Sequence, residues 1–62
     1  MEMKIDIELI KSQREKRAWT QSQLAKLSGL SLRTIQRIEK AGLASQESAK
    51  SIASVLEIPV ER

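Results

Sequence analysis

The chain contains no cysteine and no histidine among its 62 residues. The lack of cysteine excludes disulfides and thiolate metal ligands, and the lack of histidine removes the commonest metal ligand and the commonest general base near neutral pH. Its serines therefore have no histidine to activate them, and its carboxylates form no cluster typical of metal or acid–base chemistry. We expect no enzymatic activity, no metal site and no cofactor.

Glycine, proline and aromatic residues are also scarce, with two glycines, one proline and a single tryptophan. The longest apolar runs span a few residues, whereas a membrane helix needs about 20. The first ten residues carry alternating acids rather than a basic segment followed by an apolar one, so they do not resemble a secretory signal. We expect a cytoplasmic protein with no membrane partner and no small-molecule ligand.

The net charge of +3 is unevenly distributed along the chain. Residues 11–40 carry eight basic and two acidic side chains, whereas the segments on either side are weakly acidic. A basic middle of this kind is typical of a surface that faces a polyanion. It is equally typical of a solvated helix surface, so charge alone leaves both interpretations open.

The pattern of apolar residues, caps and breakers predicts a compact all-α domain of four helices over residues 1–62, with or without a short C-terminal turn. The helices are expected at about 6–17, 21–28, 32–41 and 46–57. Their start signals are polar N-cap residues, and Gln23 completes a capping box with Thr20. The expected N-caps are Asp6, Thr20, Ser31 and Ser45. Gly29, Gly42 and Pro59 are expected to end the second, third and fourth helices.

Each predicted helix has an apolar side at spacings of three and four residues. Trp19 precedes the second helix and is placed to pack on Leu24, and Leu30 is expected to insert into the core from the turn. The predicted buried residues are Ile7 and Ile10, then Leu24, Ala25 and Leu27, then Ile35 and Ile38, and finally Ala49, Ile52, Ala53 and Leu56.

The segment Thr20–Glu39 carries the functional prediction. Ala25, Gly29 and Leu30 allow the second and third helices to approach closely at a steep angle. If Ile35 and Ile38 face the core, the opposite side of helix 32–41 projects into solvent. That side has a width and charge suited to the major groove of DNA.

A set of residues in fixed order along the chain resembles the lambda-repressor-like helix-turn-helix domain of phage repressors, Cro and the XRE family of transcriptional regulators. The matching positions are Arg14, Ala18, Trp19, Thr20, Gln21, Leu24, Ala25, Gly29, Ser31, Ile35, Ile38, Glu39, Gly42, Ala53 and Leu56. The resemblance covers Leu9 to Leu56. It implies sequence-specific binding of double-stranded DNA by a transcriptional regulator, with repression favoured over activation.

The resemblance assigns groove-facing positions to the third helix. The implied base-reading residues are Ser31, Leu32, Arg33, Gln36 and Arg37. Arg33 and Arg37 can each bind guanine O6 and N7 as bidentate donors, although a phosphate contact or a plain surface role is also open. Leu32 either meets a thymine methyl group or packs against Leu27 or Trp19.

The resemblance also implies contacts with the DNA backbone and a structural ion pair. Gln21 is expected to bind a phosphate at the start of the second helix, or only to support its cap. Lys11 and Lys40 are further candidate phosphate contacts. Arg14 and Glu39 are expected to form a partly buried pair, because Arg14 lies on the apolar side of its helix and needs a partner there.

Many members of the family continue after the fourth helix into a dimerising fifth helix, whereas only residues 58–62 follow here. Dimerisation through the fourth helix and this tail, binding as a monomer, and origin in a longer protein are therefore all open. A homodimer on a pseudo-palindromic operator is the favoured expectation, with Leu43, Val55, Ile58 and Val60 available for its interface. A helical protein-interaction module, such as an antitoxin or adaptor subunit, is the alternative function.

Overall fold

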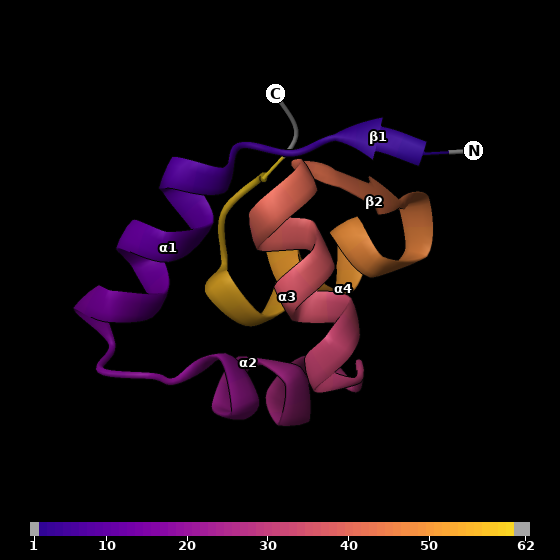
Figure 1. Ribbon diagram of the computed structural model, residues 1–62. Coiled ribbons are helices and arrows are strands. Elements are labelled where there is room, and N and C mark those ends of the chain that lie inside the picture. The colour runs from indigo at the N-terminus through magenta and orange to yellow at the C-terminus, as the bar shows by residue number, and fades with distance from the viewer. Residues whose placement is uncertain (1, 61–62) are drawn as a thin grey trace.

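A computed structural model of the protein describes residues 2–60, so Met1, Glu61 and Arg62 of the predicted domain lie outside the described residues. These residues form β1 (Glu2–Lys4), α1 (Ile7–Lys16), α2 (Gln21–Ser28), α3 (Leu32–Ala41), β2 (Leu43–Ser45) and α4 (Gln46–Leu56). Figure 1 shows α3 and α4 at the centre, α1 to one side, and α2 at the end opposite the two strands. The predicted compact four-helix fold is confirmed. None of the helices in residues 2–60 is both long and apolar enough to span a bilayer.

Polar side chains cap all four of these helices at their first turns. Asp6 Oδ1 accepts from the Leu9 N–H at 3.1 Å. Thr20 Oγ1 accepts from the Gln23 N–H at 3.1 Å, while Gln23 Oε1 accepts from the Thr20 N–H at 2.8 Å, which completes the capping box. The Ser31 and Ser45 hydroxyls accept from the N–H groups of Thr34 and Ser48. Each cap satisfies a backbone donor that has no partner within its helix.

Left-handed backbone conformations end α2, α3 and α4. Gly29 and Gly42, each with φ +73°, follow α2 and α3. Glu57 takes the same role after α4 with φ 59°, so this helix ends at Leu56, one residue before the predicted end. Ala18, in the connection from α1 to α2, is a second non-glycine residue with positive φ, at 58°. The local backbone therefore carries some strain at Ala18 and Glu57.

One hydrophobic core joins all the elements and corrects two of the sequence predictions. Its members are Ile5, Ile10, Leu24, Ala25, Ile35, Ile38, Ala44, Ala49, Ile52, Leu56 and Val60. The prediction that Leu27 is buried is wrong, because the residue is 54% exposed. The buried side of α2 runs from Leu24 to the half-buried Ser28 one turn later. Leu27 lies to one side of this line and is therefore at the edge of the core, exposed to solvent.

Val60 is the second correction, because it was predicted to be available for a dimer interface and is only 1% exposed. After α4 the chain turns back toward α1. There the Val60 carbonyl accepts a hydrogen bond from the Asp6 N–H at 3.0 Å. Val60 is therefore a core residue that ties the C-terminal segment to the start of α1.

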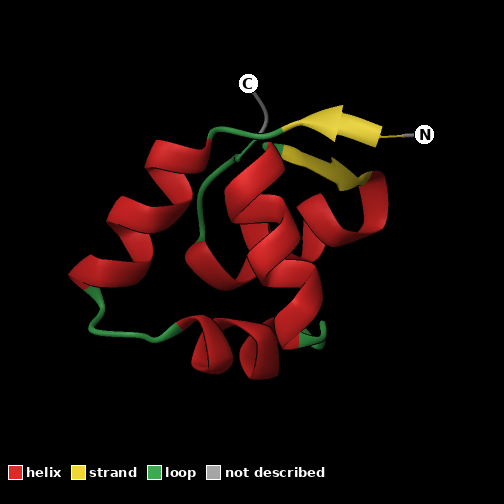
Figure 2. Ribbon diagram, in the orientation of Figure 1, coloured by secondary structure: helices red, strands yellow, loops and turns green. Residues whose placement is uncertain are grey.

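The small antiparallel sheet was not predicted from the sequence. Glu2, Met3 and Lys4 of β1 pair with Ser45, Ala44 and Leu43 of β2, respectively. Figure 2 shows the two strands side by side at one end of the helical body. The strands are three residues long and have no alternation of β-branched side chains, so only the long-range pairing defines them. The sheet places the N-terminal strand beside the connection between α3 and α4.

Candidate nucleic-acid interface

The turn between α2 and α3 fixes the relative orientation of the two helices. Gly29 takes a left-handed conformation, and the Leu30 N–H then donates to the Ala25 carbonyl at 2.9 Å. Leu30 is half-buried and packs against the core. Ser31 starts α3 immediately afterwards. The two helices therefore form a rigid helix-turn-helix unit, packed through buried residues of both.

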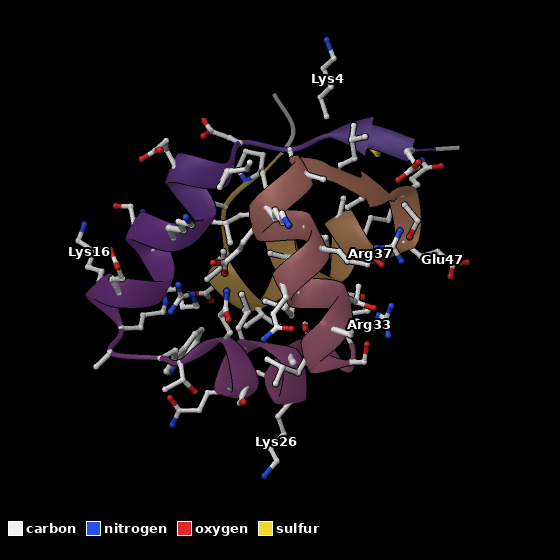
Figure 3. The ribbon with its side chains drawn as sticks, viewed as in Figure 1. Lys4, Lys16, Lys26, Arg33, Arg37 and Glu47 are labelled. Carbon is white, nitrogen blue, oxygen red and sulfur yellow. The ribbon has the colours of Figure 1, made fainter. Side chains whose placement is uncertain are left out.

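The outward side of α3 is exposed along its length. Leu32 is 40% exposed, and four polar side chains share this side: Arg33, Gln36, Arg37 and Lys40. Arg33 and Arg37 are one helical turn apart and project from the same side of α3 in Figure 3. Within residues 2–60, neither guanidinium takes part in an intramolecular hydrogen bond or ion pair. Both donor groups can therefore bind an external acceptor without breaking a bond of that kind.

Ser31 differs from the other residues predicted to face the groove because its hydroxyl already takes part in hydrogen bonds. Its Oγ accepts from the Thr34 N–H at 3.1 Å and lies 2.9 Å from Thr34 Oγ1. The Ser31 side chain therefore serves as the cap of α3. Any contact with a base uses only the hydrogen-bonding capacity that the cap leaves.

A network around Glu39 connects α1, α2 and α3. Arg14 Nε lies 3.0 Å from Glu39 Oε2, and Arg14 Nη2 donates to Glu39 Oε1 at 3.2 Å. Arg14 Nη1 also donates to the Trp19 carbonyl at 3.0 Å. The Arg14 and Glu39 side chains are 14% and 2% exposed, so this bidentate pair is largely removed from water. It locks α1 to the end of α3 beneath the helix-turn-helix unit.

Gln21 is the third member of this network. Its Nε2 donates to Glu39 Oε1 at 3.1 Å, so the side-chain donor points inward at the carboxylate. The backbone N–H groups of Gln21 and Ser22 remain at the start of α2, and neither has a partner among the described residues. The sequence does not single out Ser22, because its free backbone N–H depends on its place at the start of α2 and not on its side chain. The first turn of α2 thus offers its backbone to an anion.

Comparison with known protein families identifies this unit. A helix-turn-helix family model, that of the XRE and lambda-repressor-like proteins, matches residues 10–62. The chain belongs to this helix-turn-helix family. Proteins of the family are DNA-binding regulators of transcription, and the predicted resemblance is confirmed. No curated protein sequence matches the chain.

The remaining basic residues of this helix-turn-helix domain lie at its periphery. Lys11 on α1 and Lys40 at the end of α3, the two lysines predicted to bind phosphates, are both exposed. Lys26 projects from α2 at the end of the domain opposite the strands, as Figure 3 shows.

Trp19 is half-buried and packs against the core, with the Arg17 guanidinium 5.5 Å from its ring centroid. Its ring face is thereby covered by a cation rather than open to a base.

A hollow of about 430 Å³ opens between α3 and the segment formed by the two strands and the start of α4. Arg37 and Thr34 line it from α3, Ser45 from the end of β2, and Ser48 from the first turn of α4. Glu2 of β1 lines the same hollow, which brings the N-terminal strand to the edge of the helix-turn-helix surface. The position of Glu2 could not be predicted from the sequence, because it depends on the pairing of β1 with β2.

Proposed function

We propose that this helix-turn-helix protein is a sequence-specific transcriptional repressor that reads the major groove with α3. The observation that supports the proposal most directly is the exposure of Arg33 and Arg37, one turn apart and without intramolecular polar partners in residues 2–60. A protein of this kind acts at the chromosome, so we infer that it is nucleoid-associated.

The proposed roles on α3 follow from the chemistry of the side chains. Arg33 and Arg37 each offer the planar pair of donors that binds guanine O6 and N7, a contact worth about 1–3 kcal/mol of discrimination. Gln36 lies between them on the outward side and can bind adenine or the edge of the groove. Leu32 lies in the first turn of α3 and meets a thymine methyl group. Ser31 contributes the least, because its hydroxyl caps the helix.

The proposed backbone contacts flank this surface. Because the Gln21 side chain donates to Glu39, we assign its phosphate contact to the main-chain N–H groups of Gln21 and Ser22. The Gln21 side chain then positions the helix start. Lys11 and Lys40 supply additional charge to the DNA backbone, which strengthens binding at every sequence without selecting among them.

We further propose that two copies bind a pseudo-palindromic operator with half-sites about 34 Å apart. Leu27 is the most exposed large apolar residue in the described chain, and it borders a shallow hollow together with Val55 of α4. This patch supports a dimer contact better than Val60, which is buried. Leu43 and Ile58 are the other predicted interface residues, the first exposed and the second half-buried.

Sedimentation at micromolar concentration, with and without operator DNA, tests the dimer. We expect two copies on the operator and loss of that stoichiometry in Leu27→Lys. A single copy on operator DNA would overturn this part of the proposal.

Selection of bound sites from a random duplex library tests the function as a whole. We expect the selected half-site to contain at least one guanine. The selected sequences would also show the symmetry of the operator and the spacing between its half-sites. Affinity should fall steeply as salt rises, because binding releases counterions from the phosphates. No retention of DNA at low salt would overturn the proposal and favour the alternative, a helical module that binds a protein partner.

A further inference from the structure

The hollow beside α3 brings two opposite charges together from distant parts of the chain. Among those of residues 2–60 that line it, Arg37 and Glu2 are the charged ones. Glu2 reaches this position because β1 pairs with β2 in a register that sets Glu2 opposite Ser45, which is also part of the lining. Both side chains are exposed, long and flexible.

Arg37 therefore shares this hollow with an acidic side chain. Arg33 does not line the hollow, and Arg37 does. Figure 3 shows Arg37 directed from α3 toward the end of the domain where β2 leads into α4, the side on which Glu47 also projects. Glu47 is exposed but does not line the hollow. Of the two arginines on the outward side of α3, only Arg37 thus shares a hollow with an acidic side chain among the described residues.

We propose that Glu2 competes with DNA for Arg37 and so lowers the contribution of this arginine to binding. In free protein the carboxylate attracts the guanidinium into the hollow. On the duplex, Arg37 leaves the hollow to bind a base or phosphate, and the attraction is lost. The N-terminal strand is in this way an internal regulator of the recognition helix. The inference rests on the proposed DNA-binding function.

A thermodynamic double-mutant cycle tests the competition. Dissociation constants are measured for a mixed-sequence duplex and for the selected site at low salt, using wild type, Glu2→Gln, Arg37→Ala and the double variant. We expect Glu2→Gln to tighten binding about two- to five-fold, the range that exposed charge pairs support. The gain that depends on Arg37 should disappear in the Arg37→Ala background.

Glu47→Gln is the matched control, because it removes the same charge from the same side of the protein but from outside the hollow. It should tighten binding by less than Glu2→Gln and equally in both backgrounds. A gain from Glu2→Gln that is as large without Arg37 as with it, or an equal Arg37-dependent gain from Glu47→Gln, would overturn the proposal.

The side-chain Nε–Hε signals of the free protein give a readout that needs no DNA. Glu2→Gln should shift the Arg37 signal and leave that of Arg33 unchanged, and an unshifted Arg37 signal would contradict the proposed attraction. Failure of the wild-type protein to bind duplex would overturn the proposed function and this inference together. DNA binding without coupling between Glu2 and Arg37 would overturn this inference alone.

Discussion

Glu39 shows how much a single residue contributes to a domain of this size. Its two carboxylate oxygens accept from Arg14 and Gln21, which belong to α1 and α2, while Glu39 itself lies on α3. Its side chain is only 2% exposed, so water does not readily reach the carboxylate to replace a lost hydrogen-bond partner. Loss of a partner therefore destabilises the folded protein. A small core leaves only about 3–5 kcal/mol of net stability to absorb such a loss.

Glu39→Ala is expected to destabilise the protein by about 3–5 kcal/mol, because it leaves Arg14 as a largely buried cation without its carboxylate. Urea unfolding followed by far-UV circular dichroism measures the effect. Glu15→Ala removes an exposed carboxylate from α1 and should change stability by less than about 0.5 kcal/mol. Similar urea midpoints for the two variants would show that the ion pair contributes little.

Arg33→Ala tests base reading at the same scale. We expect it to weaken binding to the selected site by about 1–3 kcal/mol and to relax the preference at one base pair, because a bidentate contact is lost. Lys16→Ala, at the exposed end of α1, serves as the control and should leave the order of preference among sequences unchanged. Site selection with both variants measures the difference, and an unchanged preference in Arg33→Ala would assign this residue to the phosphates.

At the scale of the element, two glycines with the same backbone conformation have different surroundings. Gly29 ends α2 and Gly42 ends α3, both with φ +73°. A Cβ atom at Gly29 would meet nothing within 4 Å, whereas one at Gly42 would lie 3.0 Å from Ile7 Cδ1. The end of α3 is close to α1 because β1 and β2 hold the two segments together.

Gly29→Ala is therefore expected to cost about 1–2 kcal/mol from backbone strain alone. Gly42→Ala should cost more, because Ile7 must also move to accept the new methyl group. Thermal or urea unfolding of the two variants separates the contributions. Equal losses would mean that Ile7 adapts freely and that the packing at the end of α3 is loose.

At the scale of the whole molecule, the C-terminal segment closes the core. Val60 is buried although it follows Pro59 and lies outside every helix. Its carbonyl accepts a hydrogen bond from the N–H of Asp6, the residue just before α1. Leu27 has a larger apolar side chain and sits within a helix, yet it is largely exposed. Membership of a helix therefore does not by itself decide burial, and at Val60 the return of the chain after α4 decides it.

Val60→Ala should destabilise the monomer by about 2 kcal/mol, because it removes buried methyl groups and leaves a small cavity. Leu27→Ala should change monomer stability by less than about 0.5 kcal/mol. Denaturant unfolding at submicromolar concentration, where association does not contribute, measures both. A larger loss for Leu27→Ala than for Val60→Ala would contradict the burial described for the two residues.

The sequence by itself determined the helices and the family, because caps, glycines and apolar spacing act over three or four residues and are visible in any short segment. Thr20 with Gln23, and Ser31 with Gly29, mark the helix-turn-helix unit in this way. The same local rules identified Arg33 and Arg37 as outward-facing. They could not reveal that the side-chain donor of Gln21 turns inward to Glu39, since the two residues are 18 positions apart.

Only the tertiary structure decided what the two ends of the chain do. The pairing of β1 with β2 and the burial of Val60 depend on contacts between residues about 40 or more positions apart, for which a three-residue strand and a short tail give no periodic signal. Those long-range contacts move Val60 from a predicted interface into the core. They also bring Glu2 of β1 and Arg37 of α3 into the lining of the same hollow.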